Sequence, residues 1–354
     1  MVKPRNSLES VNKCSCIFSS SKIALKKAES IEDLLLNCPK NQAIGDNFIR
    51  AWAKINSLKY KKVVCTISGG SDSDVMLDIV WRCDKDNKVD YVWFDTGIEY
   101  QATKDHLKYL EEKYGIKILT YKAKKPIPTC CKEYGQPFIS KHVSEMMSRL
   151  IRHNFKWEDK SFNELYAEYP KCKIALSWWT NSNISDQFNI RRNKFLKEFI
   201  IQNPPTFTIS NKCCHYAKKK VIHDLIKEND YRLNIFGVRR AKGGSRVTAY
   251  KSCFDEEDNC DNYRPLFWYK DSDKDEYMEA YAIENSKCYT EYGLLRTGCA
   301  GCPYGRDFEI ELEVIKQYEP KLYKAVNSIF GDGYEYTRKY REFRKKMEEN
   351  NTKK

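Results

Sequence analysis

The chain has 354 residues, with 62 Lys and Arg against 49 Asp and Glu, so its formal net charge is +13. No apolar run in it approaches the roughly 18 residues that a membrane span needs, and its N-terminus has no apolar stretch typical of a secretory signal. We therefore expect a cytoplasmic protein without membrane contact. The positive balance fits either a lysine-rich solvated surface or a polyanionic partner such as nucleic acid.

Cysteine is unusually frequent, with 15 residues. In a chain without an export signal, metal or redox chemistry explains this number better than a set of disulfides. The positions of the cysteines therefore need to be compared with known ligand spacings.

The first chemically informative segment lies between residues 63 and 83. Residues 63–67 form an apolar run that predicts a buried strand, and residues 75–81 carry apolar side chains at helical spacing. The segment between them reads Ser68, Gly69, Gly70, Ser71, Asp72, Ser73. A strand, a glycine turn and a helix N-terminus form an anion site, because glycine lets the backbone approach an oxyanion and the first helical N–H groups point at it.

Asp72 is the unexpected member of this segment, since a carboxylate would repel a bound phosphate. We interpret it as a helix cap or as an indirect contact to Mg²⁺.

The neighbouring segments alternate between strand and helix. Residues 47–58 predict an amphipathic helix, residues 91–94 a second strand, residues 99–114 a helix and residues 117–121 a third strand. This alternation predicts a parallel sheet with right-handed crossovers. The second strand is followed by Asp95, Thr96 and Gly97, at the edge where such sheets bind ligands.

Residues 122–211 carry weaker patterns. Three prolines near the start indicate a loop, and helical spacing returns at residues 142–153 and 191–201. The pair Trp178 and Trp179 is more typical of core packing than of a platform for stacked bases. Cys130 and Cys131 are either two unrelated thiols or a redox or sulfur-carrying pair.

Two cysteine pairs lie in the second half of the chain. Cys213 and Cys214 are adjacent, and Cys299 and Cys302 form a Cys-x-x-Cys motif much later. Four thiolates in two close pairs match the ligand count of a [4Fe–4S] cluster or of tetrahedral Zn²⁺. Both metals remain open on spacing alone.

An arginine segment lies between the two cysteine pairs. An expected strand at residues 234–236 leads into Gly237, Val238, Arg239 and Arg240, and a glycine-rich turn then precedes Arg246. The guanidinium group is a rigid fork of donors suited to phosphate or sulfate. The alternative interpretation is a solvated basic turn.

In this order, the motifs resemble those of the phosphoadenosine phosphosulfate (PAPS) and adenylylsulfate reductase family. This family belongs to the adenine nucleotide alpha hydrolase superfamily, together with PP-loop ATP pyrophosphatases and tRNA thiolases. Residues 68–73 resemble the phosphate-binding PP-loop, and the cysteine pairs also resemble the iron–sulfur features of DndC-type proteins. The resemblance covers about residues 47–305. It implies an α/β fold with a Rossmann-like parallel sheet flanked by helices.

The resemblance also implies roles for individual residues. The nucleotide, ATP or an adenylylsulfate type, would be bound with Mg²⁺ by Ser68, Gly69, Gly70, Ser71, Asp72, Ser73, Asp95, Thr96, Gly97 and Arg246. The cluster, or Zn²⁺ in its place, would be held by Cys213, Cys214, Cys299 and Cys302. Catalysis would involve Arg239, Arg240 and Lys218. Lys218 occupies the lysine position of the family's Cys-Cys-x-x-Arg-Lys motif, whose arginine is replaced here by Ala217.

The expected organisation has three parts. Residues 1–45 form an N-terminal extension, residues 46–305 the PP-loop domain and residues 306–354 a basic helical region with a helix at residues 334–349. A helical insertion in the PP-loop domain is expected at about residues 140–205.

One departure from the family decides the functional expectation. The reductases attack with a cysteine in a C-terminal Glu-Cys-Gly-(Ile/Leu)-His segment, and no cysteine follows Cys302 in this sequence. We therefore favour ATP-dependent adenylylation and sulfur transfer onto a nucleic acid, tRNA or DNA, or onto a small molecule. The sulfur would come from a donor such as a cysteine desulfurase.

Two alternatives remain. A sulfonucleotide reductase could use a relocated thiol, Cys130 or Cys131, together with a thiol reductant. A nucleotide sensor without catalysis could use the same fold.

Overall fold

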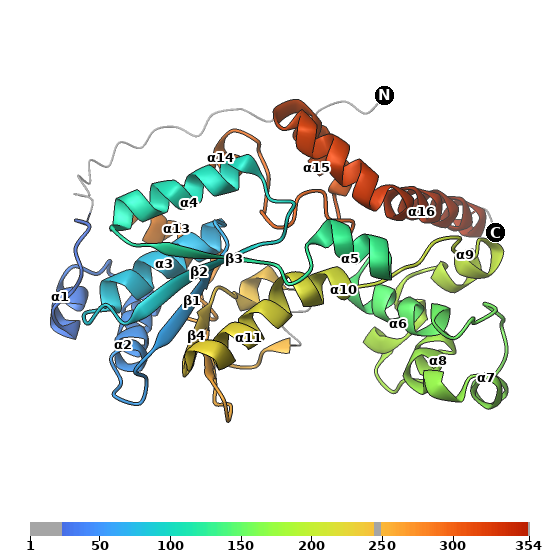
Figure 1. The fold of residues 1–354 in the computed structure, drawn as a ribbon, viewed down its shortest axis with the longest axis horizontal. Helices are drawn as coiled ribbons and strands as arrows, with labels where there is room; N and C mark the ends of the chain where they lie inside the picture. Colours follow the sequence, from blue (N-terminus) through green and yellow to red (C-terminus); the bar gives the residue numbers. More distant parts are fainter. Residues whose placement is uncertain (1–22, 244–248, 353–354) are drawn as a thin grey trace.

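The computed structural model describes residues 23–243 and 249–352, and within them a six-stranded sheet forms the centre of the molecule (Figure 1). The strand order is β3-β2-β1-β4-β6-β5, and every neighbouring pair is parallel except β5 with β6. The strands are β1 (Val63–Ile67), β2 (Val89–Asp95), β3 (Ile118–Lys122), β4 (Leu233–Phe236), β5 (Phe254–Asp255) and β6 (Asp261–Tyr263). The α/β fold with a mainly parallel sheet is confirmed.

Helices surround this sheet and extend to one side of it. They are α1 (Ile31–Leu36), α2 (Gln42–Ile55), α3 (Ser71–Cys83), α4 (Gln101–Tyr114), α5 (Ile127–Tyr134), α6 (Lys141–Ile151), α7 (Phe162–Glu168), α8 (Lys173–Trp179), α9 (Leu196–Gln202), α10 (Lys212–Cys214), α11 (Lys220–Asn229), α13 (Asp271–Ala280), α14 (Lys287–Thr290), α15 (Phe308–Tyr318) and α16 (Pro320–Thr352). Shorter turns are η1 (Pro170–Cys172), η2 (Asp186–Phe188), η3 (Ile190–Arg192), η4 (His215–Lys219) and η5 (Arg240–Lys242). None of the helices in the described ranges is both long and apolar enough to cross a membrane.

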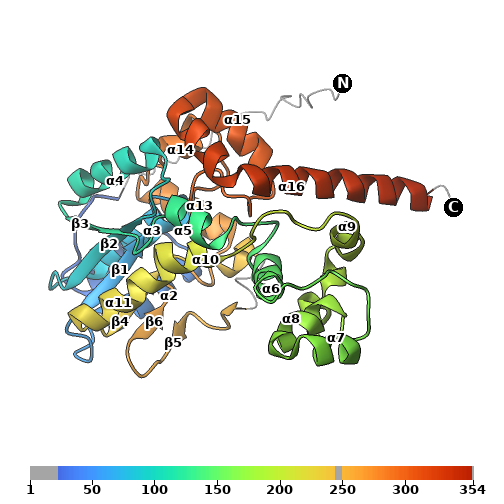
Figure 2. The ribbon, with the colours of Figure 1, turned by 45° about the vertical axis from the view of Figure 1, so that its right-hand side comes forward.

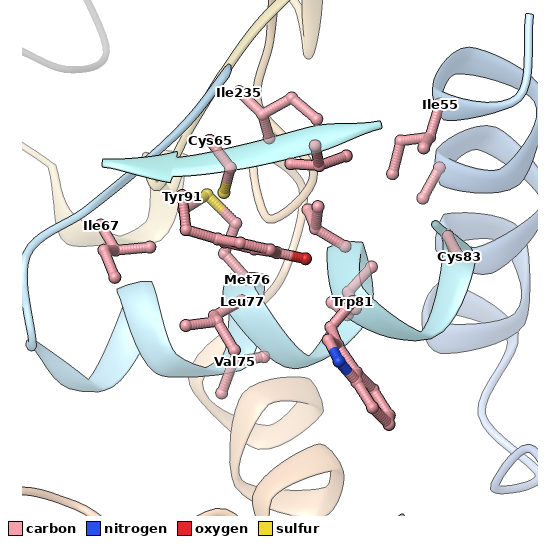
Figure 3. Packing of buried hydrophobic residues seen from close by; sticks show 14 of the residues in the cluster. Ile55, Cys65, Ile67, Val75, Met76, Leu77, Trp81, Cys83, Tyr91 and Ile235 are labelled. Atoms are coloured by element: carbon pink, nitrogen blue, oxygen red, sulfur yellow. The ribbon is translucent and has the colours of Figure 1, made fainter. Parts of the chain in front are cut away.

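The two faces of the sheet bury alternate side chains of β1. Cys65 and Ile67 pack with Val75 and Met76 of α3 (Figure 3), whereas Val64 packs on the other face with Val221 of α11. This alternation follows from the two-residue repeat of a strand. Because β1 is buried on both faces, its position is rigid, and so is the loop that follows it.

Two predicted helices begin earlier than expected. The helix expected at residues 47–58 is α2, which starts at Gln42 because the Asn41 side chain accepts hydrogen bonds from the N–H groups of Ala43 and Ile44. The C-terminal helix expected at residues 334–349 is α16, which starts at Pro320. Proline is favoured in a first helical turn, and the glycines inside α16 had concealed its first half.

The helix expected at residues 191–201 is wrong in its first half. Residues 190–192 form the 3₁₀ turn η3, and α9 starts only at Leu196. Phe195 between them has a left-handed backbone with φ +58°. An α-helix cannot continue through such a residue.

Helices α6 to α9 pack around a hydrophobic core of their own, within the range expected for the insertion. Trp178 and Trp179 are fully buried in this core, which confirms that they are packing residues. The far half of α16 joins it, because Tyr336 donates to the Asn203 carbonyl at 2.6 Å and Tyr340 donates to the Lys194 carbonyl at 2.8 Å. Figure 2 shows α16 passing beside α9.

Candidate functional site

The PP-loop follows β1 at the carboxyl edge of the sheet. Gly69 has φ +64°, and a side chain on Gly70 would place its Cβ 2.8 Å from Thr297 Oγ1. Inside the loop, the Ser68 N–H donates to Ser73 Oγ at 2.8 Å, and α3 begins at Ser71. Glycine is therefore required for both the turn and the close approach of another segment, and the loop is ordered by its own serine.

A second segment covers this loop. The phenol of Tyr289 accepts a hydrogen bond from the Ser71 N–H at 3.3 Å and another from the Thr297 N–H at 3.3 Å. These residues lie far downstream and carry no motif, so no sequence signal pointed to them. They cover the loop next to α4, since Sγ of Cys288, the residue before Tyr289, lies 3.6 Å from Oγ1 of Thr103 in α4.

Asp72 is paired with cations from two other elements. Its Oδ1 lies 2.9 Å from Arg239 Nε and 3.9 Å from Lys274 Nζ. Arg239 follows β4, the strand beside β1, and its Nη2 also lies 2.8 Å from Asp271 Oδ1. The carboxylate at the helix start is thus neutralised by basic groups, which explains how it tolerates a nearby phosphate.

The Arg239 side chain is fully buried beside the PP-loop. Its Nη1 has no hydrogen-bond partner among the residues that the structure describes. A buried donor without a partner costs free energy, and an oxyanion at the loop would supply that partner. The structure therefore places Arg239 beside the PP-loop, and its binding of an anion stays a prediction.

Arg240 and Arg246 are placed differently. Arg240 is exposed, with its guanidinium carbon 5.7 Å from the ring centre of Trp268. Arg246 lies outside the described residues. Of the three predicted arginines, the structure brings Arg239 to the PP-loop.

The Asp-Thr-Gly segment lies at the end of β2, next to β1 on its other side. Asp95 Oδ1 accepts from the Gly97 N–H at 2.9 Å, and Gly97 has φ +90°. Thr96 is buried, and its hydroxyl donates to Glu99 at 2.5 Å and lies 3.7 Å from Cys299 Sγ. The segment beside the expected nucleotide therefore reaches one of the predicted metal ligands.

Glu99 is a site residue that the sequence did not predict. It is buried, and burial raises its pKa, whereas Lys218 and the Thr96 hydroxyl act in the opposite direction. A single glutamate two residues after Asp-Thr-Gly resembles any helix-start residue, so its contact with the cysteine region could not be read from the sequence.

The Cys-x-x-Cys loop lies between α14 and α15 and is held by hydrogen bonds to its own backbone groups. The Ala300 N–H donates to the Ile98 carbonyl at 3.0 Å, and the Gly301 N–H donates to Glu311 at 3.1 Å. Tyr334 of α16 hydrogen-bonds the Gly301 carbonyl. These contacts fix the loop beside the carboxyl end of β2.

The other cysteine pair lies at the start of a continuous helical segment. Cys213 and Cys214 form α10, which continues through the π-helical turn η4 into α11. Single π-helical turns are rare and frequently occur at functional sites. The turn alters the helical register directly after the two thiols.

The four predicted ligands act on one another electrostatically. Burial raises the pKa of Cys302 to about 12, with further increases from Cys299 and Cys214. A hydrogen bond with Cys213 raises the pKa of Cys214 well above its usual range. Cys213 is buried in a cluster against which Cys214 and Cys299 pack, so the two pairs lie in one region.

Three of these four cysteines are neither fully buried nor fully exposed. Cys214, Cys299 and Cys302 are each only partly buried by surface area, although burial raises the pKa of Cys299 and of Cys302. The donor chemistry, four thiols in two pairs, suits a soft metal group.

Within residues 23–243 and 249–352, no group of three or more His, Cys, Asp or Glu side chains is arranged to hold a metal ion. A single Zn²⁺ would draw four sulfurs to about 2.3 Å from one point. A [4Fe–4S] cluster has a separate iron for each thiolate and spaces its ligands more widely. The four thiols suit either group by their chemistry, and the choice of a cluster over zinc stays a prediction.

Lys218 lies among the same thiols. Cys299 raises the pKa of Lys218 more than burial lowers it, and Glu99 and Cys214 raise it further. The ammonium group is therefore placed where it would offset the negative charge of thiolates.

A further thiol, Cys131 of α5, contacts this region. It belongs to the same buried cluster as Cys213, and its proximity raises the pKa of Cys213. Its neighbour Cys130 donates instead to the Lys125 carbonyl at 3.4 Å. The adjacent pair that the sequence left open is therefore divided between two environments.

Comparison with protein families identifies part of the chain. Residues 62–154 match the family model described as the phosphoadenosine phosphosulfate reductase domain. The resemblance read from the motifs is confirmed over this segment, which contains the PP-loop and Asp-Thr-Gly. The cysteine pairs and the arginine segment lie outside it, so their roles stay predictions.

A curated relative and two solved structures are also similar to the chain. The uncharacterized protein MJ0066 of Methanocaldococcus jannaschii is 28% identical over 183 residues, which are 49% of this chain and 35% of that protein. The chain thus spans about a third of the length of the curated relative it matches.

The PAPS reductase of Candida auris, solved as a phosphate complex, has TM-score 0.39 and 13% identity, over 78% of this chain and 97% of that chain. The U34-tRNA thiolase NcsA of Methanococcus maripaludis, solved with its [4Fe–4S] cluster, has TM-score 0.35 and 13% identity, over 86% and 81%.

Proposed function

On the premise that residues 62–154 are a domain of the phosphoadenosine phosphosulfate reductase family, we propose that this chain is an ATP-dependent enzyme that adenylylates a substrate and replaces an oxygen in it by sulfur. One observation carries the proposal. Thr96, beside the expected nucleotide, lies 3.7 Å from Cys299 of the cysteine region. Nucleotide chemistry and sulfur chemistry would therefore share one site.

The chain's own residues suit the nucleotide half of this reaction. The N–H groups at the start of α3 would bind the pyrophosphate of ATP, with Mg²⁺ near Asp72. The unpaired Nη1 of Arg239 would donate to a phosphate oxygen. Asp95 and Gly97 would frame the adenosine at the end of β2.

The proposed reaction has two steps. An oxygen of the acceptor attacks the α-phosphorus of ATP, and the bond to the bridging oxygen breaks, so pyrophosphate leaves. A thiol reductant releases sulfide from the persulfide of a donor, such as a cysteine desulfurase, and is itself oxidised to a disulfide. The sulfide then attacks the activated carbon, and AMP leaves with the oxygen. Arg239, with Arg240 and Arg246, would stabilise the negative charge that develops on the phosphate in the first step.

The cysteine region would hold the sulfur for the second step of the reaction. Bound there by Cys213, Cys214, Cys299 and Cys302, a [4Fe–4S] cluster would provide a soft site at which sulfur is held. Lys218 would offset its negative charge.

The reductase alternative has one observation in its favour. Cys131 contacts Cys213, so a thiol outside the four predicted ligands lies at the site. As a nucleophile, its thiolate would attack the sulfur of adenylylsulfate, release AMP and form an enzyme thiosulfonate, from which a thiol reductant would release sulfite. Residues 303–354 contain no cysteine and bring no such thiol. We therefore rank this alternative second.

The test uses anaerobically purified protein incubated with ATP and Mg²⁺, with and without tRNA or duplex DNA. The proposal predicts release of pyrophosphate and AMP that nucleic acid stimulates. Gly70→Ala should abolish it, because its Cβ would lie 2.8 Å from Thr297 Oγ1, whereas the control Gly45→Ala meets nothing closer than 3.9 Å. Sulfite from adenylylsulfate plus thiol, with no pyrophosphate from ATP, would establish the reductase instead.

A further inference from the structure

A cavity of about 490 Å³ lies beside the cysteine region, between α6 and α10. No residue of the PP-loop or of Asp-Thr-Gly lines it, but Cys214 does. Basic side chains dominate its wall: Lys141, Arg149, Arg152, Lys171, Lys212 and Lys219. The cavity is therefore a second, separate concentration of positive charge that adjoins one predicted metal ligand.

Most of these cations form no ion pair with the residues that the structure describes. Glu145 is the carboxylate among the lining residues, and it is paired with Arg149 at 2.6 Å. Five of the cations make no ion pair within 4.0 Å to any residue of the described ranges: Lys141, Arg152, Lys171, Lys212 and Lys219.

Some basic residues just outside the cavity are paired with carboxylates. Lys220, next to Lys219, lies 3.4 Å from Asp224, and Lys124 lies 3.6 Å from the same carboxylate. Lys125 is paired with Glu133. What distinguishes the cavity is that six basic side chains line one space with a single carboxylate among them. Like charges gathered around one space repel one another, and an anion placed there would remove that cost.

We propose that this cavity binds the phosphodiester backbone of the nucleic acid that accepts sulfur, and so brings the nucleotide to be modified toward Cys214. The inference rests on the proposed function, in which ATP occupies the PP-loop. Because the PP-loop supplies a separate anion site for ATP, the basic cavity is left for the acceptor.

The origin of the cations favours a chain of phosphates over one phosphate group. They come from three segments: α6 with the residue after it, the turn η1, and α10 with η4. Lysine dominates, and lysine acts as a point charge, whereas bidentate arginine forks read single phosphates or bases. Such contacts position a backbone and carry no sequence information. Binding should therefore depend steeply on salt and weakly on sequence.

The experiment measures fluorescence anisotropy of a labelled RNA hairpin and of a DNA duplex of matching sequence, without ATP, from 50 to 200 mM salt. Arg152→Glu with Lys171→Glu should weaken binding by about tenfold or more at low salt and flatten the dependence on salt. The control is Lys85→Glu with Lys108→Glu, which reverses two exposed charges that do not line the cavity. All four residues are exposed, so both double variants should fold.

The outcomes separate this inference from the proposed function. Binding of both probes that the cavity variant retains, or that the control variant loses equally, would overturn the inference. A stronger effect with RNA or with DNA would identify the acceptor. Failure of the proposed function would appear elsewhere, as wild-type protein that releases no pyrophosphate from ATP, and the binding assay does not depend on that result.

Discussion

The region around α3 and the region around the basic cavity differ in whether their charged side chains form ion pairs. In and beside α3, buried carboxylates are paired: Asp74 with His106 at 2.9 Å and Asp78 with Arg82 at 2.7 Å. Asp72 is paired with the fully buried Arg239. Around the cavity, exposed cations such as Arg152 and Lys171 form no ion pair with any described residue.

This difference indicates what each region contributes. Removing one partner of a buried pair leaves an uncompensated charge in the protein and costs stability. Removing an exposed unpaired charge costs little stability and can only weaken the binding of something else. Variants ordered by expected effect on stability should therefore separate the two regions.

The largest effect is expected at Arg239. Arg239→Ala would remove a fully buried side chain and its pairing with Asp72 and Asp271, at a cost of about 2–4 kcal/mol in the free energy of unfolding, because the space it fills would be left empty. Urea denaturation measures it.

The control is the neighbouring Arg240→Ala, which removes an exposed side chain and should change stability by less than about 0.5 kcal/mol, while lowering turnover. Equal stability of the two variants would contradict the expected difference between a buried, paired arginine and an exposed one.

A smaller loss is expected in the Cys-x-x-Cys loop. A Cβ at residue 301 would lie 2.7 Å from the Tyr334 hydroxyl, so Gly301→Ala should destabilise the protein by about 1–3 kcal/mol and reduce iron incorporation. Gly293 has a similar φ, +67°, and a Cβ added there would meet no atom within 4 Å. Gly293→Ala therefore has the same cost of a positive φ without the close contact. The difference between the melting temperatures of the two variants measures the cost of the contact with Tyr334.

A pH-dependent effect is expected at Asp261, on the first residue of β6. Burial pushes the pKa of Asp261 upward, but hydrogen bonds from Lys59 and Tyr60 outweigh it and leave the pKa below its usual value. Its stabilising contribution is then present at neutral pH and is lost as pH falls through the folded pKa, below about 4.

Asp261→Asn should therefore cost about 1–2 kcal/mol at pH 7, and the difference from wild type should narrow below about pH 4. Urea unfolding at several pH values measures this. A difference that stays constant into acid would refute the assignment.

The smallest effect on stability is expected in the cavity. Arg152→Glu with Lys171→Glu should shift the free energy of unfolding by about 0.5 kcal/mol or less, despite its large effect on nucleic-acid binding. A marked destabilisation in the urea titration would mean that these side chains have structural partners, and the comparison between the regions would fail.

The sequence predicted those parts of the site that depend on local order. Strand β1, its glycine turn and α3 are adjacent in the chain, so apolar spacing and glycine chemistry located them. Asp95 and Arg239 could be assigned to the same edge because each follows a strand. Parallel strands present their carboxyl ends together.

Contacts between distant segments could not be predicted in the same way. Tyr289 over the PP-loop and Glu99 beside Lys218 belong to no motif, and their positions depend on how the loops pack. The break at Phe195 was hidden because its residues keep a helical pattern of apolar side chains. The basic cavity needs the folded arrangement of α6, η1 and α10, none of which is adjacent in sequence to the others.

The proposed function requires the nucleotide loop and the cysteine region to form one site. The most direct measurement reconstitutes the protein anaerobically, quantifies iron and sulfide, and records its visible spectrum before and after addition of ATP and Mg²⁺. We expect iron and sulfide in the ratio of a [4Fe–4S] cluster and a spectrum that ATP changes in wild type but not in Gly70→Ala. Protein that binds no iron, or a cluster whose spectrum saturating ATP leaves unchanged, would contradict a shared site.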